Sequence, residues 1–252
     1  MRLKVATDSV EFGSNINDVT VPEQMRKKFL SGLDFFDSTL GGQGFTPSSA
    51  YMFTGEAGSG KTTMMLTLCD NLTRSGAIAV FNTAEESLFQ VKAACERLGL
   101  RKGFAVGSET NVDELLKKAD KFRNSEKNKD KPFMLIVDSL QCMDDGHFST
   151  GRITTASAER SLEKLTNWCK ENYTNLICIG QVNKGGQFAG TNKLKHLVDG
   201  MICLTIEKKD KDLMGCRRLE TIKNRFGGCG QTTWLSLGAT GFKIVAVTDA
   251  DE

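Results

Sequence analysis

Residues 55–62 read Gly55-Glu56-Ala57-Gly58-Ser59-Gly60-Lys61-Thr62, and this motif is the strongest indication of the fold. It matches the pattern G-x-x-x-x-G-K-[ST], in which the glycines let successive backbone N–H groups turn toward phosphate oxygens. In such a loop the lysine reaches the β- and γ-phosphates, and the hydroxyl of Thr62 binds Mg2+. Residues 55–62 and the adjoining Thr63 therefore predict a binding site for ATP and magnesium.

The segments on either side of this loop supply the strand and the helix that such a loop requires. Tyr51-Met52-Phe53 precede it as an apolar strand, and residues 62–75 follow it as a helix that ends before Gly76. The helix carries one apolar stripe, formed by Met65, Leu68, Cys69 and Leu72. This order directs the positive N-terminal end of the helix toward the phosphates.

The rest of the chain alternates short apolar runs with amphipathic segments, the pattern of a parallel sheet covered by helices on both faces. We expect further strands at 77–81, 133–138 and 176–179, and further helices at 87–98, 112–123 and 156–172. After residue 200 the pattern changes to strands separated by turns, at 201–206, 217–222, 232–237 and 242–247. The prediction is an α/β fold, a P-loop NTPase core with a mostly parallel twisted sheet flanked by helices and ending in antiparallel hairpins. Residues 1–28 are expected to form an arm or linker before a core at 29–252.

Composition limits the kinds of partner. The formal net charge is only +2, so no overall field favours nucleic acid or a membrane, and any DNA site has to be a local patch. No apolar run of eighteen residues occurs and no signal-peptide core follows Met1, so we expect a cytoplasmic protein without a membrane partner. The eight cysteines include no Cys-x-x-Cys pair, which favours reduced thiols and no zinc.

Three acidic residues complete the predicted nucleotide site. Asp138 ends the apolar run 133–138, where a buried strand would place its carboxylate beside Thr62 to hold Mg2+. Glu85 and Glu86 follow the strand at 77–81, at the end where open α/β sheets gather their ligands. Glu85 is our first choice for the group that orients and deprotonates water, and Glu86 is the reserve. Both could instead complement the dipole of the helix that begins near residue 87.

Several longer motifs are more specific than the phosphate loop. They are Gly32-Leu33-Asp34 with Leu40-Gly41-Gly42, Ala84-Glu85-Glu86-Ser87, Val137-Asp138-Ser139-Leu140-Gln141, Val182-Asn183-Lys184-Gly185-Gly186-Gln187-Phe188-Ala189-Gly190, and Lys223-Asn224-Arg225-Phe226-Gly227. Together they resemble the RecA-type core of the bacterial RadA/Sms family, over residues from about 29 to 247.

This resemblance implies a RecA-like, DNA-dependent ATPase that forms a ring, expected to be a hexamer, around single-stranded DNA in recombination and branch migration. In RecA-type rings the nucleotide lies between subunits, and a basic residue of the neighbour stabilises the γ-phosphate. Lys223 and Arg225 match that role, although they could also pair locally at a strand end. Gln181 resembles the residue that reports the γ-phosphate to a DNA loop, although a buried polar link would also explain it.

The same resemblance assigns the DNA contacts to two loops. Lys184 and Lys193 flank a glycine-rich stretch suited to gripping a phosphate backbone, with Phe188 available to stack on a base. The region 142–153, which contains Arg152, occupies the place of the other DNA loop.

The sequence also departs from the family pattern. No cysteine precedes Cys69, and the chain ends soon after the core, so we expect a core-only relative without the zinc module or the Lon-like domain, of bacterial or bacteriophage origin. Two other functions stay open. One is a nucleotide-switched assembly module that recruits replication or repair partners, and the other is a helicase of the DnaB type or its loader. Recombination or replication proteins are possible partners.

Overall fold

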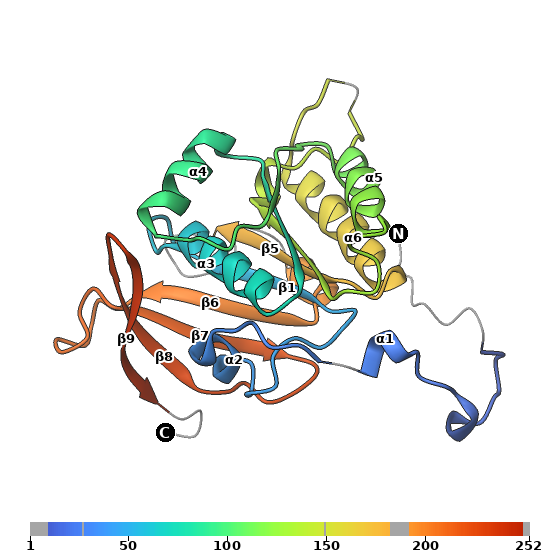
Figure 1. Ribbon diagram of the computed structural model, residues 1–252, viewed down its shortest axis with the longest axis horizontal. Helices are drawn as coiled ribbons and strands as arrows, with labels where there is room; N and C mark the ends of the chain where they lie inside the picture. The colour runs from blue at the N-terminus through green and yellow to red at the C-terminus, as the bar shows by residue number, and fades with distance from the viewer. Residues whose placement is uncertain (1–9, 27, 149, 182–191, 249–252) are drawn as a thin grey trace.

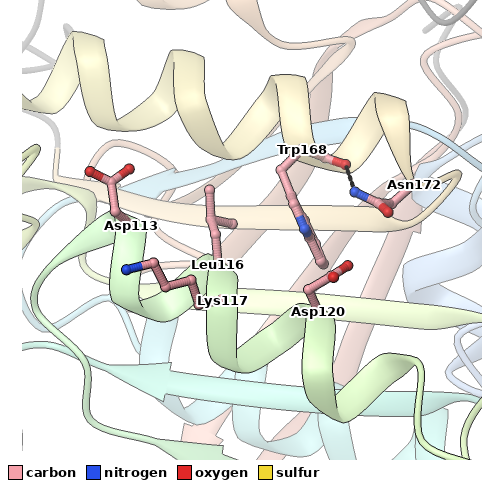
Figure 2. Close-up of a pocket in the computed structure, with 6 residues that line it drawn as sticks. All are labelled: Asp113, Leu116, Lys117, Asp120, Trp168 and Asn172. Atoms are coloured by element: carbon pink, nitrogen blue, oxygen red, sulfur yellow. Dashed lines mark hydrogen bonds between the residues drawn. The ribbon is translucent and has the colours of Figure 1, made fainter.

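A computed structural model describes residues 10–26, 28–148, 150–181 and 192–248. Its centre is a nine-stranded sheet with the strand order β3-β2-β4-β5-β1-β6-β7-β8-β9 (Figure 1). The strands are β1 (Ala50–Gly55), β2 (Ile78–Thr83), β3 (Ala105–Gly107), β4 (Phe133–Asp138), β5 (Asn175–Gln181), β6 (Gly200–Ile206), β7 (Arg217–Asn224), β8 (Thr232–Gly238) and β9 (Gly241–Thr248). The helices are α1 (Glu23–Arg26), α2 (Asp34–Thr39), α3 (Lys61–Arg74), α4 (Leu88–Arg97), α5 (Val112–Arg123), α6 (Thr155–Glu171) and α7 (Asn192–Leu197), with 3-10 turns at Ile16–Asp18 and Leu140–Cys142.

The sheet is parallel from β3 to β6 and antiparallel from β6 to β9. Every residue of β1 and of β4 is buried, as expected for parallel strands with helices on both faces. Successive side chains of β4 enter opposite cores: Met134 packs with α3 and α4, and Leu135 packs with α5 and α6. The predicted fold class is therefore confirmed, including the change to antiparallel strands at the end of the chain.

Some short elements were not predicted. β3 has three residues at the edge of the sheet, too few to show a periodic pattern, and α2 has only six residues. α2 is tied to the segment that precedes it, since the carboxylate of Asp37 accepts from the backbone N–H of Ser31 at 2.9 and 3.1 Å. Sequence periodicity cannot detect elements of this length.

Residues 10–26, the described part of the predicted arm, include no buried residue. Phe12 and Ile16 are both strongly exposed, and Figure 1 shows the segment around α1 running away from the sheet. No helix in the described ranges is both long enough and apolar enough to cross a bilayer.

All eight cysteines are free thiols. Cys69, Cys169 and Cys178 are buried, and their burial raises the pKa of each thiol, to about 12 for Cys169. These three act as small apolar core residues, whereas Cys229 is exposed.

Candidate active site

The phosphate loop connects the end of β1 to the first residue of α3. Gly58 and Gly60 have φ angles of 75° and 98°, in the left-handed region that favours glycine. A Cβ on Gly60 would also lie 2.8 Å from both Leu237 Cδ2 and Phe242 Cζ, because the β8–β9 hairpin packs against the loop. The conformation of the loop therefore depends both on its positive φ angles and on packing against the hairpin formed by β8 and β9.

Lys61 lies over the loop that precedes it. Its Nζ donates to the carbonyl oxygens of Gly55 at 3.0 Å and Glu56 at 2.9 Å. Burial lowers the pKa of Lys61, while the charges of Asp138 and Glu85 counteract this effect. The ammonium is thus held at the start of α3, where a bound anion also meets the positive end of the helix.

The hydroxyl of Thr62 and the carboxylate of Asp138 meet as predicted. Thr62 Oγ1 donates to Asp138 Oδ2 at 2.6 Å, and Asp138 is only 6% exposed. Burial raises the pKa of Asp138 to about 6, against the lowering effect of the Thr62 hydrogen bond. A hydroxyl and a carboxylate are the hard oxygen donors that Mg2+ prefers, so these two side chains fit a magnesium ion beside bound phosphates.

Glu85 and Glu86 lie next to this pair. Thr83, the last residue of β2, is aligned with Asp138, and the next N–H, that of Ala84, donates to the Asp138 carbonyl at 2.6 Å. Both glutamates are exposed, and both contribute to raising the pKa of Asp138. The charge of Glu85, unlike that of Glu86, is also among those that raise the pKa of Lys61.

The helix-dipole explanation of these glutamates fits the geometry poorly. α4 begins at Leu88 with Ser87 as its N-cap, and Ser87 forms a capping box with Gln90. The first turn of α4 contains no acidic residue, because Glu85 and Glu86 precede the cap. Their position at the end of β2 is the one that sequence reasoning required for a catalytic group, and the catalytic role stays a prediction.

Three other residues at this end of the sheet have informative surroundings. Gln181 is exposed and aligned with Gly55 in the β1–β5 register, directly beside the phosphate loop. Glu56 pairs with Lys208 at 2.5 Å and accepts from the N–H of Ile206 at 3.2 Å. The buried hydroxyl of Ser59 has no hydrogen-bond partner among the described residues. Ala57 and Gly58 are exposed, which leaves this part of the loop open to a ligand.

Lys223 and Arg225 lie at the opposite end of the sheet from the phosphate loop of their own chain. Arg225 Nη1 pairs with Asp199 Oδ1 at 3.1 Å, and Asp199 Oδ2 accepts from the N–H of Ala50, the first residue of β1, at 3.1 Å. Lys223 Nζ donates to the carbonyl oxygens of Lys195 and Val198 at 2.6 and 2.7 Å. The local pairing that the sequence left open is therefore present, and Asp199 is a partner that sequence reasoning missed.

The predicted DNA contacts are described only in part. Lys184 and Phe188 lie outside the described residues. Lys193 lies in α7, and the structure describes its backbone but not its side chain. Arg152 is exposed, in the segment that leads to α6. That segment is anchored by Asp145, which pairs with Arg160, and by Lys164, whose Nζ donates to the Asp145 carbonyl at 2.9 Å. The DNA-binding roles stay predictions.

The fold and the site together define a P-loop ATPase with a RecA-like core. Residues 29–235 match the family model described as "ATPase: KaiC", and the chain belongs to this family. The site predictions Gly55–Thr63 and Asp138 thus fall in a family of ATPases, for which ATP and Mg2+ are the expected ligands.

Similar proteins include two that carry the name DNA repair protein RadA. The protein of Haemophilus influenzae is 30% identical over 231 residues, which are 91% of this chain and 47% of the relative. The protein of Escherichia coli is 30% identical over 233 residues, which are 92% of this chain and 47% of the relative. The chain thus spans about half the length of these curated relatives. The predicted resemblance to the RadA core is confirmed.

A solved structure supports the fold. The crystal structure of a KaiC-like protein from Pyrococcus horikoshii superimposes with a TM-score of 0.70 at 19% identity, covering 87% of this chain and 99% of the other. At this identity the likeness bears on the fold alone.

Proposed function

We propose that this chain hydrolyses ATP at sites shared between adjacent copies in a ring, and that the ring acts on single-stranded DNA. The observation that carries the first part is the position of Arg225. Its guanidinium is bound beside Ala50, whereas the phosphate loop begins five residues later, at Gly55. At 3.3 Å per residue this is a separation of about 16 Å along β1. Arg225 is thus far from its own phosphate loop and available to that of a second copy.

The charges at the two ends of the strands favour a head-to-tail contact between copies of the chain. In such a contact, the strand ends that carry the phosphate loop in one copy face the opposite strand ends in the next. Glu85 and Glu86 are exposed at the edge that carries the phosphate loop. Lys223, Arg225 and Lys28 lie at the other edge, where Lys28 Nζ donates to the Phe226 carbonyl at 3.4 Å. An acidic surface on one copy that faces a basic surface on the next is a heterologous contact, one in which two different surfaces meet. Repeating this contact produces a closed ring when the rotation between adjacent copies adds up to a full turn.

Exposed aromatic residues accompany both edges. Phe89, in the first turn of α4 and close in sequence to Glu85, is 88% exposed. Phe226, next to Arg225, is 37% exposed. Exposed apolar groups around complementary charges are typical of surfaces that bind another protein. A hexamer is the ring size we propose, from the resemblance to RadA-type cores.

Within this shared site the side chains have separate roles. Lys61 and the neighbour's Arg225 stabilise charge on the γ-phosphate, and Thr62 and Asp138 hold Mg2+. Glu85 orients the attacking water and accepts its proton, and Gln181, beside Gly55, responds to the γ-phosphate. ATP and Mg2+ supply the phosphoryl group and its charge neutralisation.

The proposal for DNA rests on relatives that are named DNA repair proteins and on local basic residues, Arg152, Lys184 and Lys193. The test measures ATP hydrolysis by the purified chain with and without single-stranded DNA, together with DNA binding over a series of salt concentrations. We expect faster turnover with DNA and binding that weakens as salt increases. Equal turnover with and without DNA, and no salt-sensitive binding, would contradict the DNA role.

A second experiment separates a DNA-driven motor from an assembly switch. The double variant Lys184→Ala/Lys193→Ala should lose DNA binding and keep ATP-dependent assembly, which mass measurement with and without ATP would report. That result supports the motor, whereas unchanged activity of the double variant would support the assembly switch.

A further inference from the structure

Asp199 is a buried carboxylate that connects three elements of the fold. It is 1% exposed and lies between α7 and β6. Its oxygens accept from Lys170 Nζ at 2.9 and 3.0 Å and from the N–H of Ala50 at 3.1 Å. Lys170 belongs to the last turn of α6, and Ala50 begins β1. A buried carboxylate with several donors has a fixed orientation, because losing any of them is costly.

Arg225 is attached to Asp199 by two different bonds, one to its carboxylate and one to its backbone carbonyl. Its Nη1 pairs with Asp199 Oδ1 at 3.1 Å, and its backbone N–H donates to the Asp199 carbonyl at 3.0 Å. Among the described residues, Asp199 is the carboxylate with which Arg225 forms an ion pair. The Arg225 side chain is nevertheless 47% exposed, so part of its planar fork of donors faces solvent.

The dependence between the two residues runs in one direction. Without Arg225, Asp199 would still accept from Lys170 and from Ala50. Without the carboxylate charge of Asp199, Arg225 would lose its ion pair and, among the residues that the structure describes, would keep only its backbone bond. Lys223 differs, since it is held by the carbonyl oxygens of Lys195 and Val198.

From this arrangement we propose that Asp199 is a positioning residue for the ATPase reaction of the adjacent subunit. It fixes the guanidinium of Arg225 at the exposed edge of the sheet, oriented for the phosphates bound by a second copy. A fixed guanidinium loses little entropy when it meets its phosphate, whereas a free arginine has to be ordered at that moment. This inference rests on the proposed function, because it requires that Arg225 acts in trans.

The first part of the test is kinetic. Asp199→Asn keeps an oxygen that can accept from Ala50 but removes the charge that orients Arg225. We expect the kcat for ATP hydrolysis to fall by up to about 10²-fold with little change in KM, the size of effect that misplacing a catalytic group produces. Lys170→Met is the matched control: it removes the other cation bound to Asp199 and leaves the Arg225 pair in place, so kcat should stay close to that of the wild type. Equal losses of kcat in the two variants would overturn the proposal.

The second part mixes subunits, which separates positioning from a merely structural role. Lys61→Ala subunits have a defective phosphate loop but an intact Arg225. Mixed with them, Asp199→Asn subunits should regain activity, because their own phosphate loops then receive a correctly held arginine. Mixed with Arg225→Ala subunits they should regain none, because both partners lack a working arginine. Recovery in both mixtures, or in neither, would overturn the positioning role.

Two controls keep the outcome clear. Asp199→Asn leaves the Lys170 ammonium without its carboxylate partner, which could prevent folding. In that case the double variant Asp199→Asn/Lys170→Met removes the ammonium as well, and the same mixing pattern is expected of it. The mixture of Lys61→Ala with Arg225→Ala tests the shared site itself. If this mixture recovers no activity, both the inter-subunit site and the positioning role are contradicted. If it does recover activity, but Asp199→Asn subunits are rescued by both partners or by neither, only the positioning role is contradicted.

Discussion

Thr62 Oγ1 donates a 2.6 Å hydrogen bond to Asp138 Oδ2, joining the first turn of α3 to the last residue of β4. The two residues are far apart in the sequence and meet because β1 and β4 both pair with β5 in parallel. Their carboxyl ends therefore lie at the same end of the sheet, which brings together the two side chains predicted to hold Mg2+.

The carboxylate of Asp138 is buried, and when it is ionised this lowers the free energy of unfolding. Nucleotide binding nevertheless requires the ionised form, which would hold Mg2+. Burial raises the pKa of Asp138 from its usual 3.8 to about 6, which corresponds to roughly 3 kcal/mol. A carboxyl with a raised pKa stabilises the fold at low pH, and that stabilisation is lost as pH rises through about 6. Asp138→Asn should therefore unfold at higher denaturant than the wild type at pH 7.5, measured in EDTA without nucleotide. The difference should shrink toward pH 4, and Mg2+-dependent ATP hydrolysis should be lost. A variant less stable than the wild type at pH 7.5 would contradict this account.

Lys61→Ala removes the ammonium that lies over the phosphate loop. We expect ATP hydrolysis to be abolished, because the β- and γ-phosphates lose their main cationic contact. Lys92→Ala, an exposed lysine of α4 that pairs with Glu96, is the matched control and should keep full turnover. Substantial hydrolysis by Lys61→Ala, measured as phosphate release, would show that the site is misplaced.

Glu85→Gln and Glu86→Gln distinguish the two glutamates at the end of β2. If Glu85 accepts the proton of the attacking water, Glu85→Gln should lower kcat by roughly 10²–10⁴-fold and leave ATP binding intact. Glu86→Gln should change kcat little, because Glu86 is the reserve choice and, of the two glutamates, only Glu85 has a charge that acts on the pKa of both Lys61 and Asp138. Fluorescent-nucleotide binding and phosphate release, measured on the same samples, separate binding from chemistry. The reverse order of the two effects would assign the base to Glu86.

Two glycines of the phosphate loop should respond differently to alanine. Gly58→Ala places a Cβ in open space, so it should cost about 1–2 kcal/mol from the left-handed φ alone. Gly60→Ala adds a clash with Leu237 and Phe242, which raises the expected cost by a further ~1–3 kcal/mol. Chemical denaturation of both variants gives the comparison, and equal losses would mean that the hairpin yields without cost.

Arg225→Ala should spare ATP binding and lower hydrolysis by about 10³-fold, the low end for an arginine supplied by a neighbour. Arg217→Ala is a control on the same strand, since Arg217 begins β7 at the other end. Mixing with Lys61→Ala subunits should restore turnover in part. Loss of ATP binding by isolated Arg225→Ala subunits would point to a role within the same chain.

Local patterns made much of the fold and site predictable. The phosphate loop, the apolar strand that ends in Asp138 and the stripe of α3 are each contained in one short segment. The environment of Arg225 is not, because Asp199, Lys170 and Ala50 come from separate elements. The pairing of Glu56 with Lys208 was missed for the same reason, since it spans the distance from the phosphate loop to the β6–β7 turn. Contacts of this kind depend on the finished sheet, so no single segment predicts them.

The contact between Gly60 and the β8–β9 hairpin has a practical meaning for fragments of this chain. A fragment that stops before Thr232 would retain the phosphate loop, Asp138 and both glutamates, and so every motif by which a P-loop protein is recognised. It would lack Leu237 and Phe242, the two side chains that pack against Gly60 of the phosphate loop. The minimal nucleotide-binding unit therefore extends beyond the motifs of the phosphate site, and shortened versions of the chain should keep residues 232–248.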